Sequence, residues 1–141
     1  MDIFPDGIDL YAAGSPCPSY SSANNANAAG DKDARGQLIY VAVDFVEAKR
    51  PKAFLLEQSG QLQSKYKDVL KKILKRTRKA GYNVTYKLLN TLEHGLPQNR
   101  PRVYVAGVRA DVEKEPFAWP KRLETNNDLI GVVLQSFHKQ Q

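Results

Sequence analysis

The chain has 141 residues, of which 42% are hydrophobic, and it carries 21 Lys and Arg residues against 15 Asp and Glu residues, a formal net charge of +6. This composition excludes a wholly disordered chain, and with no apolar run of about 20 residues we expect no membrane-spanning segment. The single cysteine and the two widely separated histidines, His94 and His138, exclude a disulfide scaffold and predict that no metal is bound.

The excess of positive charge indicates an anionic partner, and nucleic acid is the first candidate. Many of the lysines and arginines lie between residues 65 and 79, so the alternative is a helix whose charged face serves only solubility. The length corresponds to one domain or to part of one.

The first expected element is a short strand at residues 8–13, which ends at a Gly-Ser-Pro turn signal. Residues 19–36 are rich in Ser, Asn, Ala and Gly, a composition that predicts a mobile loop. A stripe of apolar residues at helical spacing begins at Leu38, and Pro51 closes that helix.

Residues 53–56 then predict a buried strand that ends at Glu57. The next helix, around residues 66–79, has apolar residues on one side and basic residues on the other, with a stop signal at Gly81. The remaining expected elements are strands at residues 84–89 and 103–108, a loop at 113–125 and a last short element at 129–137.

This alternation of strands and helices is typical of an α/β fold with a mainly parallel sheet. In such sheets, functional sites gather beyond the carboxyl ends of the strands. Pro16 and Cys17 follow one expected strand, Glu57 ends another, and residues 98–102 lie in the loop between the last two strands. We therefore expect these three segments to form the functional site.

Cys17 and Glu57 each have a catalytic interpretation and a structural one. A thiolate at Cys17, exposed at a strand end near a cationic group, would be a nucleophile, and the alternative is a small buried hydrophobic side chain. At the mouth of an apolar strand, Glu57 would be partly desolvated and able to hold or donate a proton near neutral pH. Its alternative role is that of a helix-capping or loop carboxylate.

Arg100 and Arg102 flank Pro101, whose ring restricts the local backbone. In an extended segment, side chains two residues apart point the same way. Two guanidinium groups on one side suit a phosphate or the carbonyl oxygen of a base, and the alternative is an ordinary basic strand edge.

Four motifs, in order along the chain, resemble those of the DNA (cytosine-5) methyltransferase family. Residues 14–21, GSPCPSYS, resemble its Pro-Cys motif, and residues 33–38, DARGQL, resemble the segment that opens the next helix. Residues 54–59, FLLEQS, resemble its Glu-Asn-Val motif, and residues 95–103, GLPQNRPRV, resemble its Gly-Val-Pro-Gln-x-Arg-x-Arg motif. The resemblance implies part of the Rossmann-like fold of class I S-adenosylmethionine-dependent methyltransferases.

The resemblance also implies a reaction, the transfer of a methyl group from S-adenosylmethionine to carbon 5 of cytosine in DNA. Cys17 would attack carbon 6 of the ring, Glu57 would hydrogen-bond or protonate ring nitrogen 3, and Arg102 would contact the base carbonyl, with Arg100 beside it. The target base must leave the helix to reach the pocket, and residues 22–30 occupy the place of the family's mobile closing loop. The other implied contacts are Pro16 and Leu38 with the methyl donor, and Ser21, Gln98 and Arg102 with DNA or the base.

The sequence departs from the family at several points. Residues 58–59 are Gln-Ser where the family has Asn-Val, and residues 93–94 are Glu-His where Asp-Tyr is more usual. Before Asp9 we identify no glycine-rich cofactor loop and no ribose-binding carboxylate. We therefore expect residues 1–112 to be the catalytic portion, and residues 113–141 to be a truncated tail that leads toward an absent target-recognition region. The expected partners are DNA and a second chain that supplies the cofactor-binding half and the target-recognition domain.

Two other functions are compatible with the same sequence. A non-catalytic nucleic-acid-binding remnant would use the basic helix together with Arg100 and Arg102, and its salt-sensitive binding would survive the loss of Cys17. A tRNA cytosine-5 methyltransferase would share the fold and the nucleophile. The complete set of reacting residues favours an enzyme over a remnant. The residues of the Pro-Cys motif, GSPCPSYS, favour DNA over tRNA as the substrate.

Overall fold

The computed structural model of the chain describes residues 6–16, 32 and 36–123. The expected loop at residues 19–36 falls almost entirely outside these residues, and the expected element at 129–137 falls outside them altogether. Among the described residues, no helix is long and apolar enough to cross a membrane.

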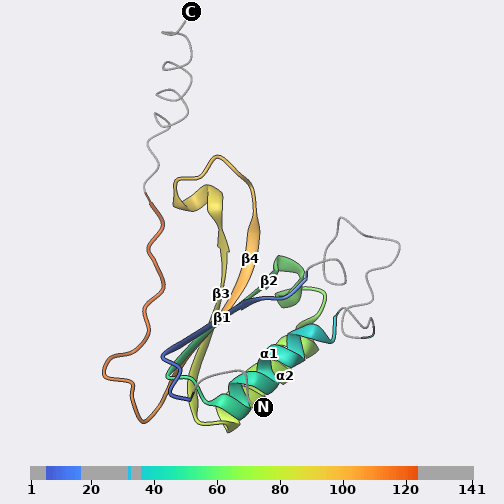
Figure 1. Cartoon of the computed structure of the whole chain (residues 1–141). Helices are drawn as coiled ribbons and strands as arrows, with labels where there is room; N and C mark the ends of the chain where they lie inside the picture. The colour runs from blue at the N-terminus through green and yellow to red at the C-terminus, as the bar shows by residue number, and fades with distance from the viewer. Residues whose placement is uncertain (1–5, 17–31, 33–35, 124–141) are drawn as a thin grey trace, which may run out of the picture.

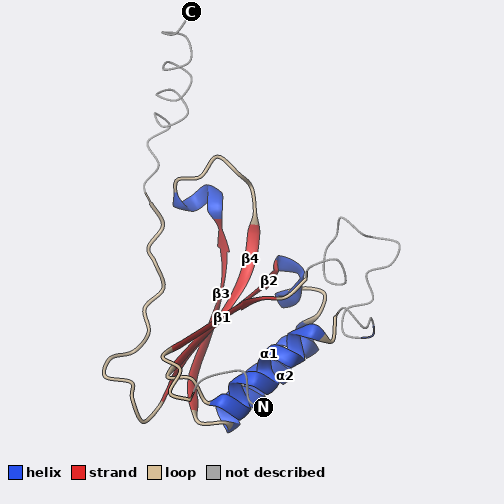
Figure 2. Ribbon diagram, in the orientation of Figure 1, coloured by secondary structure: helices blue, strands red, loops and turns tan. Residues whose placement is uncertain are grey.

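Within the described residues, four strands and two α-helices follow one another in the order β1-α1-β2-α2-β3-β4, an α/β arrangement as expected, with 3₁₀ turns after β2 and β3 (Figures 1 and 2). Their bounds are β1 Leu10–Gly14, α1 Leu38–Lys49, β2 Ala53–Ser59, η4 Gly60–Gln63, α2 Lys67–Lys79, β3 Tyr82–Asn90, η5 Thr91–His94 and β4 Pro101–Arg109.

The sheet has the order β1-β2-β4-β3, and it is mixed rather than mainly parallel. β1 and β2 are parallel because α1 carries the chain back between them, whereas β4 is antiparallel to both β2 and β3. The expectation of a mainly parallel sheet was therefore wrong for this part of the chain. The physical reason is the connection at residues 91–100, which is a short turn without a crossover helix and so returns β4 in the opposite direction to β3.

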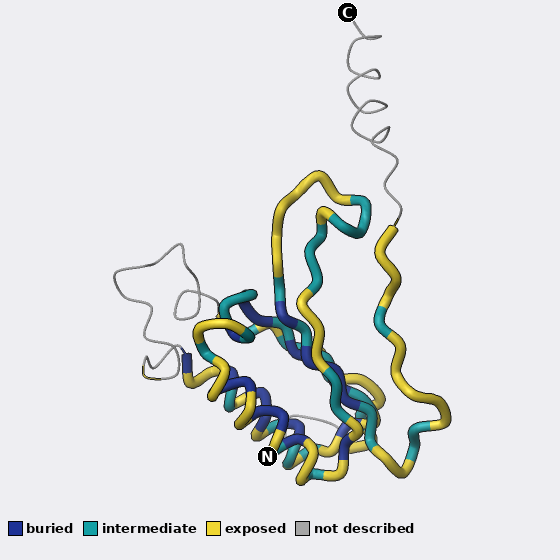
Figure 3. The backbone as a smooth tube through the Cα atoms, turned by 180° about the vertical axis from the view of Figure 1, so that it is seen from behind, coloured by how far each residue is buried: buried dark blue, intermediate teal, exposed yellow. Residues whose placement is uncertain are grey.

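Both helices pack on one face of the sheet, where the hydrophobic core lies (Figures 1 and 3). Alternate residues of β2 and β4 point into this layer, because successive side chains of a strand face opposite sides. Phe54, Leu56, Val103 and Val105 are each no more than 4% exposed. From the helices, the core receives Ile39, Val43 and Val46 of α1 and Val69, Leu70, Ile73 and Leu74 of α2.

After β4 the chain returns beside β3 without helix or strand, as the prolines of this segment predicted. The indole Nε1 of Trp119 donates to Thr85 Oγ1 at 3.2 Å, and an Nη of Arg122 donates to Glu93 Oε1 at 2.7 Å. These two contacts attach the segment to β3 and to η5, so it ends near the connection between β3 and β4.

The core contains one position where only glycine fits. Gly107 of β4 lies directly opposite Phe54 of β2, and a Cβ at position 107 would overlap the Phe54 ring. Phe54 also packs edge-on against Tyr82, with 5.1 Å between ring centroids. The ring therefore fills the space above Gly107 and is held on its other side by Tyr82.

We predict that Gly107→Ala lowers the free energy of unfolding by about 1–3 kcal/mol, because the added methyl group overpacks the core. Urea denaturation of the purified chain measures this change. Combining it with Phe54→Leu should cost less than the sum of the two single changes, since the smaller side chain makes room for the methyl group. A strictly additive double variant would contradict the overlap.

Candidate active site

The antiparallel direction of β4 brings three of the expected segments to one edge of the sheet. β1 and β2 both end there, with Gly14 paired to Glu57. β4 begins there, with Arg102 paired to Ser59. Glu57 and Arg102, two of the residues expected to act together, therefore lie side by side, although the sheet that brings them together is not the parallel one predicted.

Glu57 lies within β2 rather than at its end, since the strand continues to Ser59. Its neighbours Leu56 and Gln58 are buried toward the helices, so the Glu57 side chain lies on the opposite face of the sheet. The side chain is 25% exposed, which leaves the carboxylate accessible at that face. The expectation that β2 ends at Glu57 was wrong because the strand pairs with β4 for two further residues.

Arg102 is the partner of Glu57. The Arg102 Nε atom lies 2.9 Å from Glu57 Oε1, and the Arg102 side chain is 18% exposed. The N–H of this buried Nε is not directed at an acceptor among the described residues, so the contact is an ion pair without a well-formed hydrogen bond. One Nη donates to the Pro101 carbonyl at 2.9 Å. The pair places a carboxylate and a guanidinium next to each other on an accessible face.

Gly14 permits the close approach of this carboxylate to β1. A Cβ at position 14 would lie 3.0 Å from Glu57 Oε2, closer than side chains normally approach one another. Gly14 lies three residues before Cys17 in the Pro-Cys motif. Steric space explains the glycine at this position, because a residue without a Cβ leaves room for the Glu57 side chain.

Gln58 is a site residue whose role the sequence reasoning missed, because it was noted only as a departure from Asn. Its side chain is 1% exposed, and its Nε2 donates to Ser15 Oγ at 2.8 Å. Its Oε1 accepts a hydrogen bond from the Ser59 backbone N–H at 2.8 Å. The amide thus connects the end of β2 to the residue two positions before Cys17. A polar residue that continues an apolar strand was the signal in the sequence.

The connection that contains Gln98 and Arg100 is organised by Asn90, a second residue that the sequence reasoning missed. Asn90 Oδ1 accepts from the backbone N–H of Arg100 at 2.9 Å, and its Nδ2 donates to Asn99 Oδ1 at 2.7 Å. Gly95 has a φ of 85°, in the left-handed region that favours glycine. Asn at a strand end before a turn is a capping pattern that could have identified this role.

The other expected site residues are less closely grouped. Gln98 and Arg100 are exposed in the connection before β4, and the structure brings neither into the ion pair of Glu57 and Arg102. Pro16 is exposed just after β1, and Leu38 is 42% exposed at the first position of α1. Cys17 and Ser21 lie outside the described residues.

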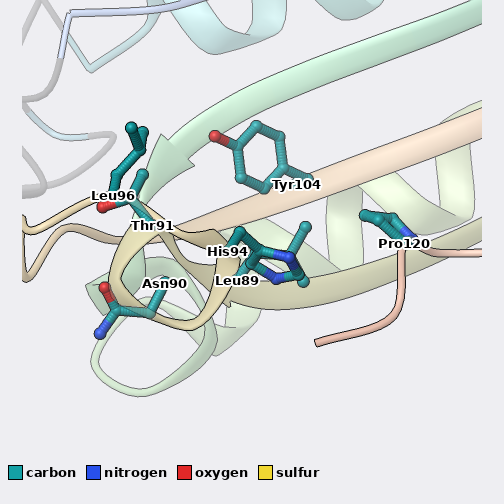
Figure 4. Close-up of a pocket in the computed structure, with 7 residues that line it drawn as sticks. All are labelled: Leu89, Asn90, Thr91, His94, Leu96, Tyr104 and Pro120. Atoms are coloured by element: carbon teal, nitrogen blue, oxygen red, sulfur yellow. The ribbon is translucent and has the colours of Figure 1, made fainter. Parts of the chain in front are cut away.

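A small pocket of about 180 Å³ lies beside this site, between the β3–β4 connection and the returning segment (Figure 4). Tyr104 of β4, the register partner of Glu57, forms one of its sides. None of the expected catalytic residues that the structure describes lines this pocket. Its lining consists of Leu89, Asn90, Thr91, His94, Leu96, Tyr104 and Pro120.

Comparison with protein families gives a match to the C-5 cytosine-specific DNA methylase profile over residues 2–141. Among curated proteins, the chain is 38% identical over 119 residues to the Type II methyltransferase M.NgoPII of Neisseria gonorrhoeae and 37% identical over 136 residues to M.HaeII of Haemophilus aegyptius. The matches cover 84% and 94% of this chain but only 34% and 41% of these relatives. The chain therefore spans about two fifths or less of their length.

Two solved structures share the fold. A prophage-encoded protein from E. coli, described as a DNA modification methyltransferase, matches with a TM-score of 0.62 and 24% identity, over 83% of this chain and 32% of that one. The Entamoeba histolytica methyltransferase EhMeth matches with a TM-score of 0.56 and 19% identity, over 83% of this chain and 37% of its own. At these identities the likeness concerns the fold alone.

We predict that Gln58→Leu lowers the free energy of unfolding by about 1–3 kcal/mol, because it removes a buried hydrogen bond and leaves the Ser59 N–H without its acceptor. Ser15→Ala should cost less, since the hydroxyl that it removes belongs to a residue that is only partly buried. In a double-mutant cycle followed by urea denaturation, the coupling between the two changes should be about 0.5–1.5 kcal/mol. Additive effects would mean that the contact does not stabilise the chain.

Proposed function

The chain belongs to the C-5 cytosine-specific DNA methylase family, and we propose that it supplies the cytosine-attacking part of a DNA (cytosine-5) methyltransferase. The methyl group comes from S-adenosylmethionine and goes to carbon 5 of cytosine in DNA. The observation that carries the proposal is the Glu57–Arg102 ion pair, at the edge of the sheet where Ser15 and Pro16 lead into Cys17.

In the proposed reaction, the Cys17 thiolate adds to carbon 6 of the ring and makes carbon 5 nucleophilic. Carbon 5 would then take the methyl group from the sulfonium sulfur of S-adenosylmethionine, which would leave as S-adenosylhomocysteine. Loss of the proton on carbon 5 then expels the thiolate and restores the ring. Glu57 holds ring nitrogen 3, where charge develops as the thiolate adds. Arg102 contacts the base carbonyl and neutralises the carboxylate when no base is bound.

The geometry of the ion pair supports these two roles. A carboxylate and a guanidinium that are adjacent on one face can meet neighbouring groups on the edge of one base. The contact between them lacks a well-formed hydrogen bond, so a base can replace it without breaking one. The backbone of Glu57 and Arg102 is held in place by the ladder between β2 and β4.

We assign DNA as the partner of this site, and the target base must leave the duplex to reach Glu57. Ser21 and Gln98 are the proposed further DNA contacts, and Arg100 stands beside Arg102. The exposure of Gln98 and Arg100, both in the connection that precedes β4, supports contact with a ligand larger than one base.

The methyl donor would touch Pro16 and Leu38. Both residues are exposed, and β1 ends and α1 begins at the same edge of the sheet (Figure 1). These two residues can form one side of a donor site, and residues 6–16 and 36–123 contain no glycine-rich loop that could form the rest of it. S-adenosylmethionine supplies the methyl group, and the chain's own residues orient the acceptor.

We further propose that a second polypeptide portion, supplied by another chain, completes the donor site beside β1. Among the described residues, β1 pairs only with β2, so its other edge is open to a further strand. Leu10 at this edge strand is 63% exposed. An open edge with an exposed apolar side chain favours pairing with another strand. Residues 1–112 are then the catalytic portion, and residues 113–141 lead toward the target-recognition region.

We predict a covalent adduct with DNA that contains 5-fluorocytosine, because fluorine at carbon 5 blocks the final elimination. The chain is incubated with this DNA and S-adenosylmethionine, with and without the cofactor-binding portion of the Haemophilus aegyptius relative. A denaturation-resistant adduct, detected by gel and by mass, should form only when that portion is present, and the isolated chain should methylate no DNA.

The control is Cys17→Ala, which should abolish the adduct under every condition, and Glu57→Ala should reduce its rate of formation by about 100-fold or more. An adduct with the isolated chain would support the chemistry and overturn the need for a second portion. No adduct in either case would overturn the proposed reaction.

A further inference from the structure

The positive charge of the chain is concentrated in one short segment. Residues 65–79 contain eight of the 21 Lys and Arg residues but only one of the 15 Asp and Glu residues. The rest of the chain therefore has 13 basic and 14 acidic residues, and its charges nearly cancel. The whole excess of +6 thus arises from α2 and the residues just before it.

The packing of α2 leaves most of these cations exposed. The apolar side of the helix is buried against the sheet and α1. Thr77 is the buried polar residue on that side, and its Oγ1 donates to the Ile73 carbonyl at 2.8 Å. Arg76 turns toward α1, where an Nη forms ion pairs with Asp44 and Glu47. Lys72 Nζ lies 6.0 Å from the ring centroid of Tyr40 of α1. The remaining cations of the helix are exposed and form what we call the basic face: Lys67, Lys71, Lys72, Lys75, Arg78 and Lys79.

The basic face has few acidic residues to balance it. Asp68 is the only acidic residue of α2, and its Oδ1 atom lies 3.9 Å from Lys71 Nζ. Among the described residues, no acidic side chain forms an ion pair with Lys67, Lys75 or Lys79. Like charges four residues apart on a helix are destabilising, so mixing both signs would be the simpler way to keep this face soluble. An arrangement that costs stability points to an anionic partner.

The basic face is separate from the candidate active site. Its helix covers one face of the sheet, whereas Glu57 and Arg102 lie on the other. α2 nevertheless starts soon after β2 ends, so the basic face begins at the edge of the sheet that carries Glu57 and extends away from it (Figure 2). The basic helix and the Arg102 site are therefore two separate surfaces.

We propose that the basic face of α2 binds the phosphate backbone of duplex DNA, without sequence preference, as a surface additional to the active site. From Lys67 to Lys79 it extends about 18 Å, at about 1.5 Å per residue. Duplex DNA carries one phosphate per about 1.7 Å of its axis, so several phosphates lie within reach of the lysines. Binding here releases counterions and requires neither Cys17 nor a flipped base.

The test compares two triple variants of the full chain that remove equal charge. In the first, Lys67, Lys71 and Lys75 of the basic face are changed to Gln. In the matched control, Lys52, Lys114 and Lys121, which are exposed elsewhere, are changed to Gln. Binding to a short fluorescent duplex is measured by anisotropy between about 50 and 200 mM salt.

Loss of three phosphate contacts should weaken binding by the first variant tenfold or more at about 100 mM salt and reduce the slope of log K against log salt by about 2.7. The control should lose less than about threefold. Cys17→Ala should bind as the parent chain does, which separates this surface from the proposed reaction, whose own readout is the covalent adduct. The unfolding midpoint of the first variant should not fall, since the change relieves repulsion.

Three results would overturn the proposal. One is an equal loss in both triple variants, which would indicate an effect of net charge alone. Another is a parent chain that does not bind duplex DNA. The third is equal or tighter binding of polyglutamate or duplex RNA, which would assign the basic face to a different anionic partner.

Discussion

The position of the candidate site depends on one feature of the backbone, the antiparallel insertion of β4 between β2 and β3. Because β4 runs against β2, its first residues lie beside the last residues of β2, and Arg102 meets Glu57. A parallel strand in the same place would put Arg102 at the opposite edge of the sheet. The short connection after β3 enforces this direction, and Asn90 holds the connection in shape.

One face of the sheet packs against the helices, and the other carries the charged pair of the candidate site. Because successive side chains of a strand point to opposite faces, each strand residue belongs to one face or the other. Phe54, Leu56 and Gln58 face the helices, whereas Glu57 between them faces the opposite side. Small residues make this arrangement possible. Gly107 accepts the Phe54 ring within the core, and Gly14 accepts the Glu57 carboxylate on the other face. A well-packed core on one side therefore fixes the position of a charged pair on the other.

Charge is distributed as unevenly as burial. The cations of the site edge, Arg100 and Arg102, are few, and one of them is paired with a carboxylate. The cations of the basic face of α2 are more numerous and exposed, and Asp68 is the single acidic residue of that helix. Under the function that we propose, this division would separate recognition of a single base from attraction to the DNA backbone. The first needs two groups at defined positions, and the second needs only density of charge.

The sequence by itself determined the helices and strands of the described residues and their order, because these depend on short patterns. Apolar periodicity predicted both helices and all four strands, and the Gly-Leu-Pro-Gln segment marked the connection before β4. Only the tertiary structure decided the direction of β4, the true end of β2 and the contact of Gln58 with Ser15, 43 residues away. Pairing direction and long-range side-chain contacts depend on how distant segments meet in space. No local pattern in the sequence specifies which distant segments come into contact. The same strand pattern fits a parallel and an antiparallel neighbour equally well.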